Sequence, residues 1–169
     1  MSGAPAAFLD RDGVLIEDCG YPHKPEHLVL IPGAAEAVRR LKSLGYLTVI
    51  VTNQSGVARG LFTEDQMHDF NALLIAQLAQ DGGVIDAVYA APYHADAVIE
   101  RYRHPDHPDR KPNPGMLLRA IEEHGIDPSK SLMIGDQPTD VEAARRAGVA
   151  GHLFKGDNLD AFVQSLTAG

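Results

Sequence analysis

Near the N-terminus the chain reads Ala6-Ala7-Phe8-Leu9-Asp10-Arg11-Asp12-Gly13. Its first four residues form a short apolar run, which is typical of a strand buried on both faces of a parallel sheet. Asp10 and Asp12 follow two residues apart, so on an extended backbone their side chains lean to the same side. An Asp-x-Asp-Gly sequence is also a common turn. Taken alone, the stretch therefore indicates a strand and its end more firmly than it indicates chemistry.

Short β-rich runs alternate with longer helical patterns along the chain. The other predicted strands cover 47–51, 85–90, 132–134 and 151–154. Helices are predicted from about 34 to 44, from Thr63 onward, from 113 to about 125 and from about 139 to 148. Thr63 and Gln66 form a capping-box pattern, and the apolar stripe that follows is Met67, Phe70, Leu74 and Leu78. The alternation predicts an α/β fold, a doubly wound (Rossmann-like) parallel sheet with helices on both faces.

The composition is that of one globular domain covering residues 1–169, with 44% hydrophobic and 22% charged residues. The net charge is −8, and the basic residues are scattered, so nucleic acid and anionic membranes are not expected partners. The sequence shows neither an export signal nor an apolar run of membrane-spanning length. We therefore expect a cytoplasmic protein and, without an evident interface motif, a monomer.

Polar residues follow several predicted strands, at the edge where open parallel sheets bind their ligands. These residues are Asp10, Asp12, Thr52, Asn53 and Asp136, with Arg110 and Lys111 at the end of a long loop. Four separate segments of the chain are thus expected to meet at one edge of the sheet.

Two carboxylates at one strand end can divide nucleophilic and acid–base work. Asp10 would attack phosphorus to give an aspartyl phosphate, while Asp12 would protonate the leaving oxygen and later deprotonate water. Asp136 would supply a further oxygen ligand for a hard cation such as Mg²⁺, with Asp140 as a weaker ligand. The alternative role of Asp136 is to form a turn or to place charge at the start of the following helix.

The remaining strand-end groups suit an anionic substrate. The Thr52 hydroxyl and the Asn53 amide can donate to phosphate oxygens, and Lys111 can neutralise a phosphoryl group. Arg110 can hold another anionic group through two parallel hydrogen bonds. The alternative for such an Arg-Lys pair is an ordinary solvated position on the surface.

Taken in order, these pieces resemble the four motifs of the haloacid dehalogenase superfamily of phosphatases over nearly the whole chain. The matching residues are Asp10-Arg11-Asp12-Gly13, Thr52-Asn53, Lys111, and Gly135-Asp136 with Asp140. Each motif is weak alone, and their order makes the resemblance strong. It implies the superfamily fold, here without a large cap domain, and Mg²⁺ as the cofactor.

Within the superfamily the chain is similar to the D-glycero-D-manno-heptose 1,7-bisphosphate phosphatase family, in Gly20 to His23, Thr52 to Gly60 and Arg110 to Pro112. The resemblance implies a small phosphorylated sugar as substrate, hydrolysed at carbon 7. It implies that Mg²⁺ is held by Asp10, by the backbone carbonyl of Asp12 and by Asp136, while Thr52 and Lys111 steady the phosphoryl group. The substrate contacts that it implies are Arg11, Asp18, Cys19, Gly20, Tyr21, Asn53, Gln54, Ser55 and Arg110.

The loop at about 92–111 is long enough to shape the substrate site. Many members of the family hold a structural zinc ion there through three cysteines and one histidine. Here those positions read Ala91, His94, His107 and Asp109, and Cys19 is the only cysteine of the chain. His94, His104, His107 and Asp109 would offer a substitute set of ligands. We favour a metal-free loop instead, held by prolines and hydrogen bonds.

Other functions share parts of this pattern. Histidinol phosphate is the nearest alternative substrate, since its phosphatase belongs to the same subgroup. A signalling receiver domain also carries an acceptor Asp, acidic magnesium ligands, a Thr and a Lys at strand ends, but its acidic pair precedes the acceptor strand. A folded but inactive binding protein is disfavoured, because every motif residue is present.

Overall fold

The computed structural model describes residues 3–168, which form a five-stranded sheet in the order β3-β2-β1-β4-β5. The strands are β1 (Ala6–Leu9), β2 (Leu47–Asn53), β3 (Ala87–Ala91), β4 (Leu132–Gly135) and β5 (Ala150–Leu153). Every neighbouring pair is parallel, and in the central strand Phe8 lies opposite both Val49 and Met133. The predicted parallel sheet is therefore confirmed, and β1 lies at its centre.

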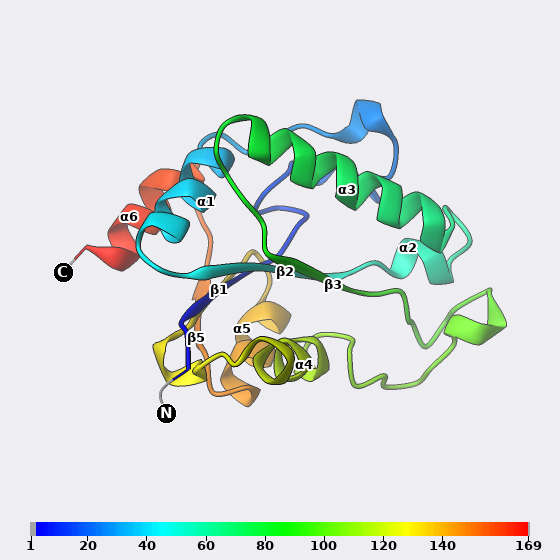
Figure 1. Ribbon diagram of the computed structural model, residues 1–169. Coiled ribbons are helices and arrows are strands. Elements are labelled where there is room, and N and C mark those ends of the chain that lie inside the picture. The colour runs from blue at the N-terminus through cyan, green and yellow to red at the C-terminus, as the bar shows by residue number, and fades with distance from the viewer. Residues whose placement is uncertain (1–2, 169) are drawn as a thin grey trace.

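Helices cover both faces of this sheet, as predicted (Figure 1). Successive residues of β1 point to opposite faces. Ala7 and Leu9 face the layer made by α1 (Ala34–Ser43), α3 (Glu64–Gln80) and α6 (Leu159–Thr167), which lies above the sheet in Figure 1. Ala6 and Phe8 face the layer made by α4 (Gly115–His124) and α5 (Pro138–Arg146), which lies below it. Two apolar cores result, one on each face, and β1 is buried between them.

The capping box that begins α3 is confirmed. Its N-cap is Thr63, whose hydroxyl oxygen accepts from the backbone N–H of Gln66 at 3.1 Å. The Gln66 side chain in turn accepts from the backbone N–H of Thr63 at 2.8 Å. The predicted stripe of α3 is buried: Met67, Phe70, Leu74 and Leu78. This helix therefore takes a fixed direction across the face of the sheet.

Several predicted boundaries are wrong by a few residues. Helix α4 begins at Gly115 instead of residue 113, because the Asn113 side chain is bonded to Asp106 and His107 of the preceding loop. Strand β2 continues to Asn53, because it pairs with β3 as far as Ala91. Strands β3, β4 and β5 are each displaced or extended by one or two residues, and α5 spans Pro138–Arg146.

Two helices are absent from the prediction. The short helix α2 (Ser55–Ala58) follows β2 directly, and α6 begins after Asn158, whose side chain accepts from the backbone N–H of Ala161. An Asn N-cap before an apolar pattern of Leu159, Phe162 and Val163 was the available signal for α6. Short 3₁₀ helices lie at Pro25–His27, Glu100–Tyr102 and Pro128–Lys130.

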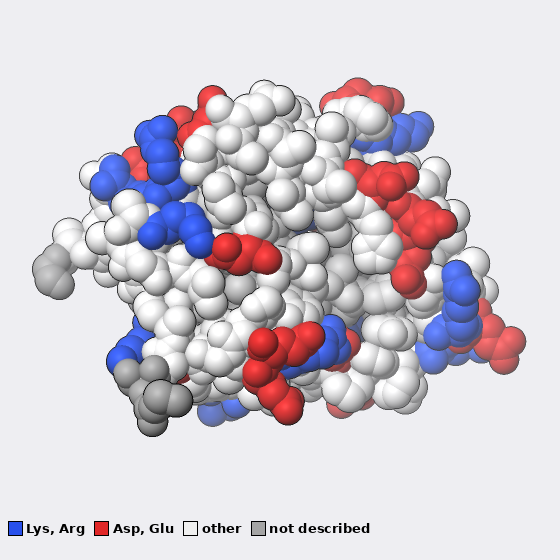
Figure 2. Space-filling view, viewed as in Figure 1, with Lys and Arg blue, Asp and Glu red and all other residues white. Residues whose placement is uncertain are grey.

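Charge is mixed over the molecular face in Figure 2, where basic groups lie beside acidic ones and wide areas carry neither. Among residues 3–168, none of the helices combines the length and the apolar character needed to cross a bilayer.

Candidate active site

The carboxyl ends of β1, β2 and β4 meet at a cleft of about 170 Å³. Its lining residues are Asp10, Asp12, Asp18, Thr52, Asn53, Lys111, Asp136, Gln137, Thr139 and Asp140. The structure thus brings together the strand-end residues that the sequence placed at one edge, with the exception of Arg110. Gln137 and Thr139 are additions from the turn and first residues of α5.

Three carboxylates gather in this cleft. Oxygens of Asp10, Asp136 and Asp140 all lie within 4.8 Å of one another, and no other such group of acidic, His or Cys ligands occurs within residues 3–168. Two glycines permit the crowding: a Cβ at Gly13 would overlap the Asp136 carboxylate, and a Cβ at Gly135 would overlap the Asp140 side chain. A set of carboxylate oxygens is the donor type that hard divalent cations prefer, so the residues fit Mg²⁺.

Lys111 is the buried cation of the cleft, with 3% of its surface exposed. Its ammonium group donates to Asp140 at 2.6 Å, to the Val51 carbonyl at 3.0 Å and to Asp10 at 3.1 Å. Burial opposes the charged form, but the Asp10 and Asp140 carboxylates outweigh it and raise the pKa of Lys111. A charged Lys111 therefore lies beside the Asp10 carboxylate in the cleft.

Burial disfavours the charged forms of the carboxylates in this cleft. Burial raises the pKa of Asp10 despite the opposing charge of Lys111, and the Asp140 and Asp12 carboxylates raise it further. Burial and the Asp140 carboxylate likewise raise the pKa of Asp136. Asp140 also accepts from the backbone N–H groups of Asp136 and Gln137, at 3.2 and 3.1 Å. A divalent cation among these oxygens would offset their mutual repulsion.

Asn53 fixes the position of Lys111. Its side-chain oxygen accepts from the backbone N–H of Lys111 at 3.0 Å, and its side-chain nitrogen donates to the Lys111 carbonyl at 3.2 Å. The Thr52 hydroxyl, 1% exposed at the residue level, accepts from the Gln54 side chain at 2.9 Å. The end of β2 thus orders the cleft partly through contacts between protein groups.

Arg11, which the resemblance implied as a substrate contact, does not line the cleft. Its side chain is fully buried at 0% exposure. Its contacts account for the burial, because the guanidinium donates to the side chains of Asp12, Gln54 and Asn71. A side chain without accessible surface has no atom to offer a substrate.

Most of the other predicted substrate contacts line a second cleft of about 360 Å³, which shares Asp12, Asp18 and Asn53 with the first. Its lining also includes Gly20, Tyr21, Gln54 and Ser55. Cys19 is exposed and lines neither cleft. Arg110 also lines neither, and its guanidinium donates to the Tyr93 carbonyl at 3.2 Å. Burial, followed by the neighbouring charge of Arg59, lowers the pKa of Arg110.

The histidines of the loop at 92–111 are engaged in local hydrogen bonds. The Nδ1 atoms of His94, His104 and His107 each accept a backbone N–H from the residue two positions later, at 2.9, 3.1 and 3.0 Å. The Nε2 atom of His94 lies 3.2 Å from the Arg59 guanidinium, and Asp109 is paired with Arg119 at 2.8 Å. These contacts would hold the loop in place without a metal ion. The metal-free loop itself remains a prediction.

This support predicts a pH dependence of stability. Burial, followed by nearby arginine charges, lowers the pKa of His94 below its ordinary 6.5, and burial also lowers that of His107. The unfolded chain then binds more protons, so the stability from these rings is complete above pH 6.5 and is lost as pH falls through the lowered values. We expect the melting temperature of the double variant His94→Asn/His107→Asn to fall less between pH 7 and 5 than that of the unmodified protein.

Asn is the informative replacement, because its side-chain oxygen can accept the same backbone N–H without titrating. His68→Asn is the matched control, since this ring is 60% exposed on α3 and lies outside the loop. Metal analysis of protein purified without chelator should precede the measurement, because bound zinc would occupy the same ring nitrogens. Parallel slopes for the double variant and the unmodified protein would contradict the loop mechanism.

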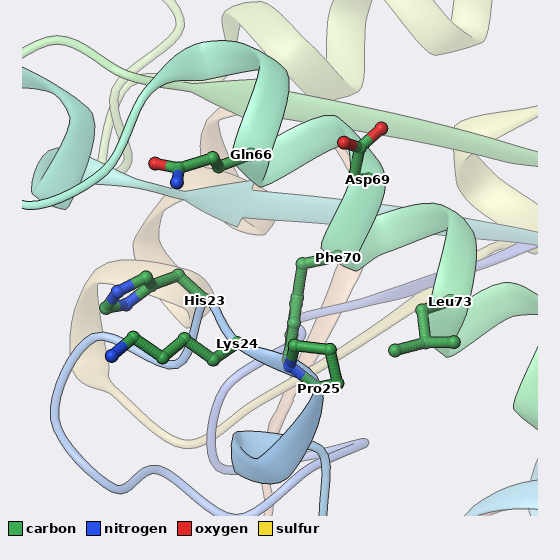
Figure 3. A pocket seen from close by; sticks show the side chains of 7 residues that line it. All are labelled: His23, Lys24, Pro25, Gln66, Asp69, Phe70 and Leu73. Atoms are coloured by element: carbon green, nitrogen blue, oxygen red, sulfur yellow. The ribbon is translucent and has the colours of Figure 1, made fainter.

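A further cleft, of about 290 Å³, lies between α3 and the segment that follows β1 (Figure 3). Its lining residues are His23, Lys24, Pro25, Gln66, Asp69, Phe70 and Leu73. It shares none of these residues with the two clefts at the strand ends, and it includes none of the three clustered carboxylates.

Comparison with known proteins gives one consistent result. The sequence profile of haloacid dehalogenase-like hydrolases matches residues 5–148. A D-glycero-beta-D-manno-heptose-1,7-bisphosphate 7-phosphatase from Rhodopseudomonas palustris is 42% identical over 163 residues, 96% of this chain and 89% of that protein.

Two crystal structures are also similar. One is a HAD-like phosphatase from Mesorhizobium loti, with a TM-score of 0.87 and 41% identity over 92% of this chain and 75% of that one. The other is the D,D-heptose 1,7-bisphosphate phosphatase of B. bronchiseptica in complex with magnesium and phosphate. It has a TM-score of 0.79 and 30% identity, over 97% of this chain and 87% of that one.

Proposed function

Because the chain belongs to the haloacid dehalogenase-like hydrolases, and within them to the heptose bisphosphate 7-phosphatase family, we propose that it removes the carbon 7 phosphate of D-glycero-D-manno-heptose 1,7-bisphosphate. The observation that carries the proposal is the 42% identity with the R. palustris phosphatase over 96% of this chain. The cleft at the strand ends supports it, because an acidic cluster and a buried lysine meet there at one point.

Asp10 is the proposed nucleophile. Attack of its carboxylate on phosphorus forms an aspartyl phosphate and breaks the bond to the leaving oxygen, which takes a proton from Asp12. Asp12 then accepts a proton from the water that attacks the aspartyl phosphate, which releases phosphate and restores Asp10. Both side chains line the same cleft, and Lys111 lies 3.1 Å from Asp10, where it can hold the phosphoryl group with the Thr52 hydroxyl.

Mg²⁺ is the proposed cofactor, and when bound it would polarise the phosphoryl group and offset its negative charge. The proposed ligands are the Asp10 carboxylate, the backbone carbonyl of Asp12 and the Asp136 carboxylate. Asp140 belongs to the same cluster, but one of its oxygens accepts from Lys111 and the other from backbone N–H groups. We therefore assign Asp140 to positioning Lys111 and the Asp136 loop.

The second cleft is the proposed site of the sugar. Its lining offers the Asp18 carboxylate, the Gln54 amide and the Ser55 hydroxyl, which are hydrogen-bonding groups suited to a polyhydroxylated substrate. It adjoins the first cleft at Asp12 and Asn53, so a sugar there can place one phosphate beside Asp10. Arg110 is proposed to meet the other phosphate after a rotation of its side chain. We further propose that the enzyme acts as a monomer in the cytoplasm.

A comparison of substrates tests this proposal. The kcat/KM value for heptose 1,7-bisphosphate should exceed those for histidinol phosphate and simple sugar monophosphates by about 10²-fold or more, because binding of the remote phosphate is used in the transition state. Activity should disappear with EDTA and return with Mg²⁺. Equal kcat/KM values for all esters would remove the substrate assignment, and full activity in EDTA would remove the metal.

A further inference from the structure

Arg11 forms a buried link between the proposed acid–base residue and the helical layer. Its Nε atom donates to one oxygen of Asp12 at 2.7 Å, and its Nη2 atom lies 3.3 Å from the other. A planar guanidinium that binds both oxygens of a carboxylate fixes the plane of that carboxylate. Arg11 is completely buried, whereas the Asp12 side chain keeps 22% exposure toward the cleft.

The guanidinium is itself held from three parts of the chain. Its Nη1 atom donates to the Asn71 side chain of α3 at 2.8 Å, and Nη2 donates to the Pro22 carbonyl and the Gln54 side chain, each at 3.1 Å. The Phe70 ring lies 4.8 Å from the guanidinium carbon. Figure 3 shows Phe70 reaching from α3 toward the segment of His23 to Pro25. Arg11 therefore has little freedom to rotate.

Two neighbours indicate that this arrangement serves Asp12. The Gln54 nitrogen donates to Thr52 at 2.9 Å and lies 3.4 Å from Asp12, so Gln54 connects Arg11 with two groups of the cleft. Asn71 is 3% exposed, and its side-chain nitrogen is a buried polar atom without a hydrogen-bond partner among the described residues. A buried donor without a partner lowers the stability of the folded protein by about 1–3 kcal/mol. An apolar residue would avoid that cost but would leave Nη1 of Arg11 without its acceptor.

We propose that Arg11 is a positioning residue that fixes the Asp12 carboxylate for proton transfer to the leaving oxygen, an inference that rests on the function proposed above. A general acid must lie within hydrogen-bonding distance of the atom that it protonates. Displacement of a reacting group by about 1 Å can cost about 10²-fold in rate. Arg11 acts through Asp12 and makes no contact with the substrate.

The test uses two substrates that differ in their need for a proton. The sugar oxygen of heptose 1,7-bisphosphate leaves poorly without protonation, whereas the nitrophenolate of p-nitrophenyl phosphate leaves as an anion. In Arg11→Met, kcat/KM for the sugar phosphate should fall about 10²-fold, and kcat/KM for p-nitrophenyl phosphate less than about threefold. This ratio reports steps up to release of the leaving group, so the later hydrolysis of the aspartyl phosphate does not enter.

Arg40→Met is the matched control. Arg40 of α1 binds both oxygens of Asp160 of α6, at 2.8 and 3.1 Å, outside the clefts at the strand ends. Its loss should leave both kcat/KM values unchanged. In an Asp12→Asn background, Arg11→Met should cause no further loss on the sugar phosphate, because its effect passes through Asp12. Equal losses on both substrates, or losses that add in the double variant, would show a merely structural role and overturn the inference.

Two further measurements separate the possible failures. If Arg11→Met does not fold, Arg11→Lys keeps the charge without the planar fork and should show the same substrate-dependent loss. If the unmodified enzyme prefers another alkyl phosphate, the proposed substrate is wrong, and the ratio is measured with that ester. If it hydrolyses no ester, the proposed activity is wrong. A crystal structure of the Arg11 variant then decides, since an unchanged Asp12 orientation overturns the inference.

Discussion

Replacement of the proposed nucleophile in Asp10→Asn should lower the rate of phosphate release by at least about 10⁴-fold and leave the fold intact. An amide oxygen cannot attack phosphorus as a carboxylate does, whereas Asn has nearly the same shape as Asp. Steady-state phosphate release measures the loss, and circular dichroism checks the fold. Residual activity above about 1% would contradict the covalent mechanism.

The same variant has a predicted effect on stability. Burial raises the pKa of Asp10 from 3.8 to about 8 in the metal-free protein, against the opposing charge of Lys111. The stability from this group is then complete below pH 3.8 and is lost as pH rises toward 8. Since Asn does not ionise, metal-free Asp10→Asn should melt at or above the temperature of the unmodified protein at pH 8.

Asp12→Asn is the matched comparison for metal binding. Its side chain lies outside the three-carboxylate cluster, and its proposed contact with Mg²⁺ uses the backbone carbonyl, which the substitution retains. Mg²⁺ should therefore raise the melting temperature of Asp12→Asn as it does for the unmodified protein, but should raise that of Asp10→Asn much less. Equal shifts for the two variants would contradict the proposed set of ligands.

Lys111→Met should reduce the free energy of unfolding of the metal-free protein by about 3–5 kcal/mol at pH 7, because it leaves buried carboxylates without their cation. The ammonium group bonds to Asp10, Asp140 and the Val51 carbonyl, and the residue is 3% exposed. Phosphate release should also fall strongly, since the phosphoryl group loses its protein cation. Urea unfolding followed by circular dichroism measures the stability.

Lys42→Met provides the surface control. Lys42 pairs with Asp86 at 2.7 Å, with side-chain exposures of 31% and 26%, and such a pair is worth about 0.2–1 kcal/mol. Added Mg²⁺ should restore part of the stability lost in Lys111→Met and none of that lost in Lys42→Met. If the two variants lose the same stability, the charge of Lys111 does not hold the cleft together.

The convergence of Asp10, Thr52, Lys111 and Asp136 followed from the sequence, because parallel strands bring their carboxyl ends to one edge. The burial of Arg11 did not follow from a local pattern, because the residue lies in a bend after β1 and its guanidinium is held by Asp12, Gln54 and Asn71. The assignment of Arg11 to the substrate came from family resemblance, which identifies a position in a motif but not the direction of its side chain.

Other parts of the site depend on contacts that no local pattern reveals. Asp140 was expected as a weak metal ligand, yet it accepts the shortest of the Lys111 hydrogen bonds, from a residue 29 positions earlier in the chain. Asn71 lies on the helical stripe of α3, where its spacing indicates only a buried position. Its contact with Arg11 joins residues 60 positions apart. Such partners follow from packing of α3 against the segment after β1.

The two hydrogen bonds between the Asn53 side chain and the backbone of Lys111 separate the long loop, whose sequence can change, from the cleft residues, whose sequence cannot. It ties the last residue of the long loop to the end of β2, so changes between residues 93 and 110 need not disturb the lysine. Evolution can then alter or discard the contents of that loop, a metal site included, while the phosphate chemistry stays the same.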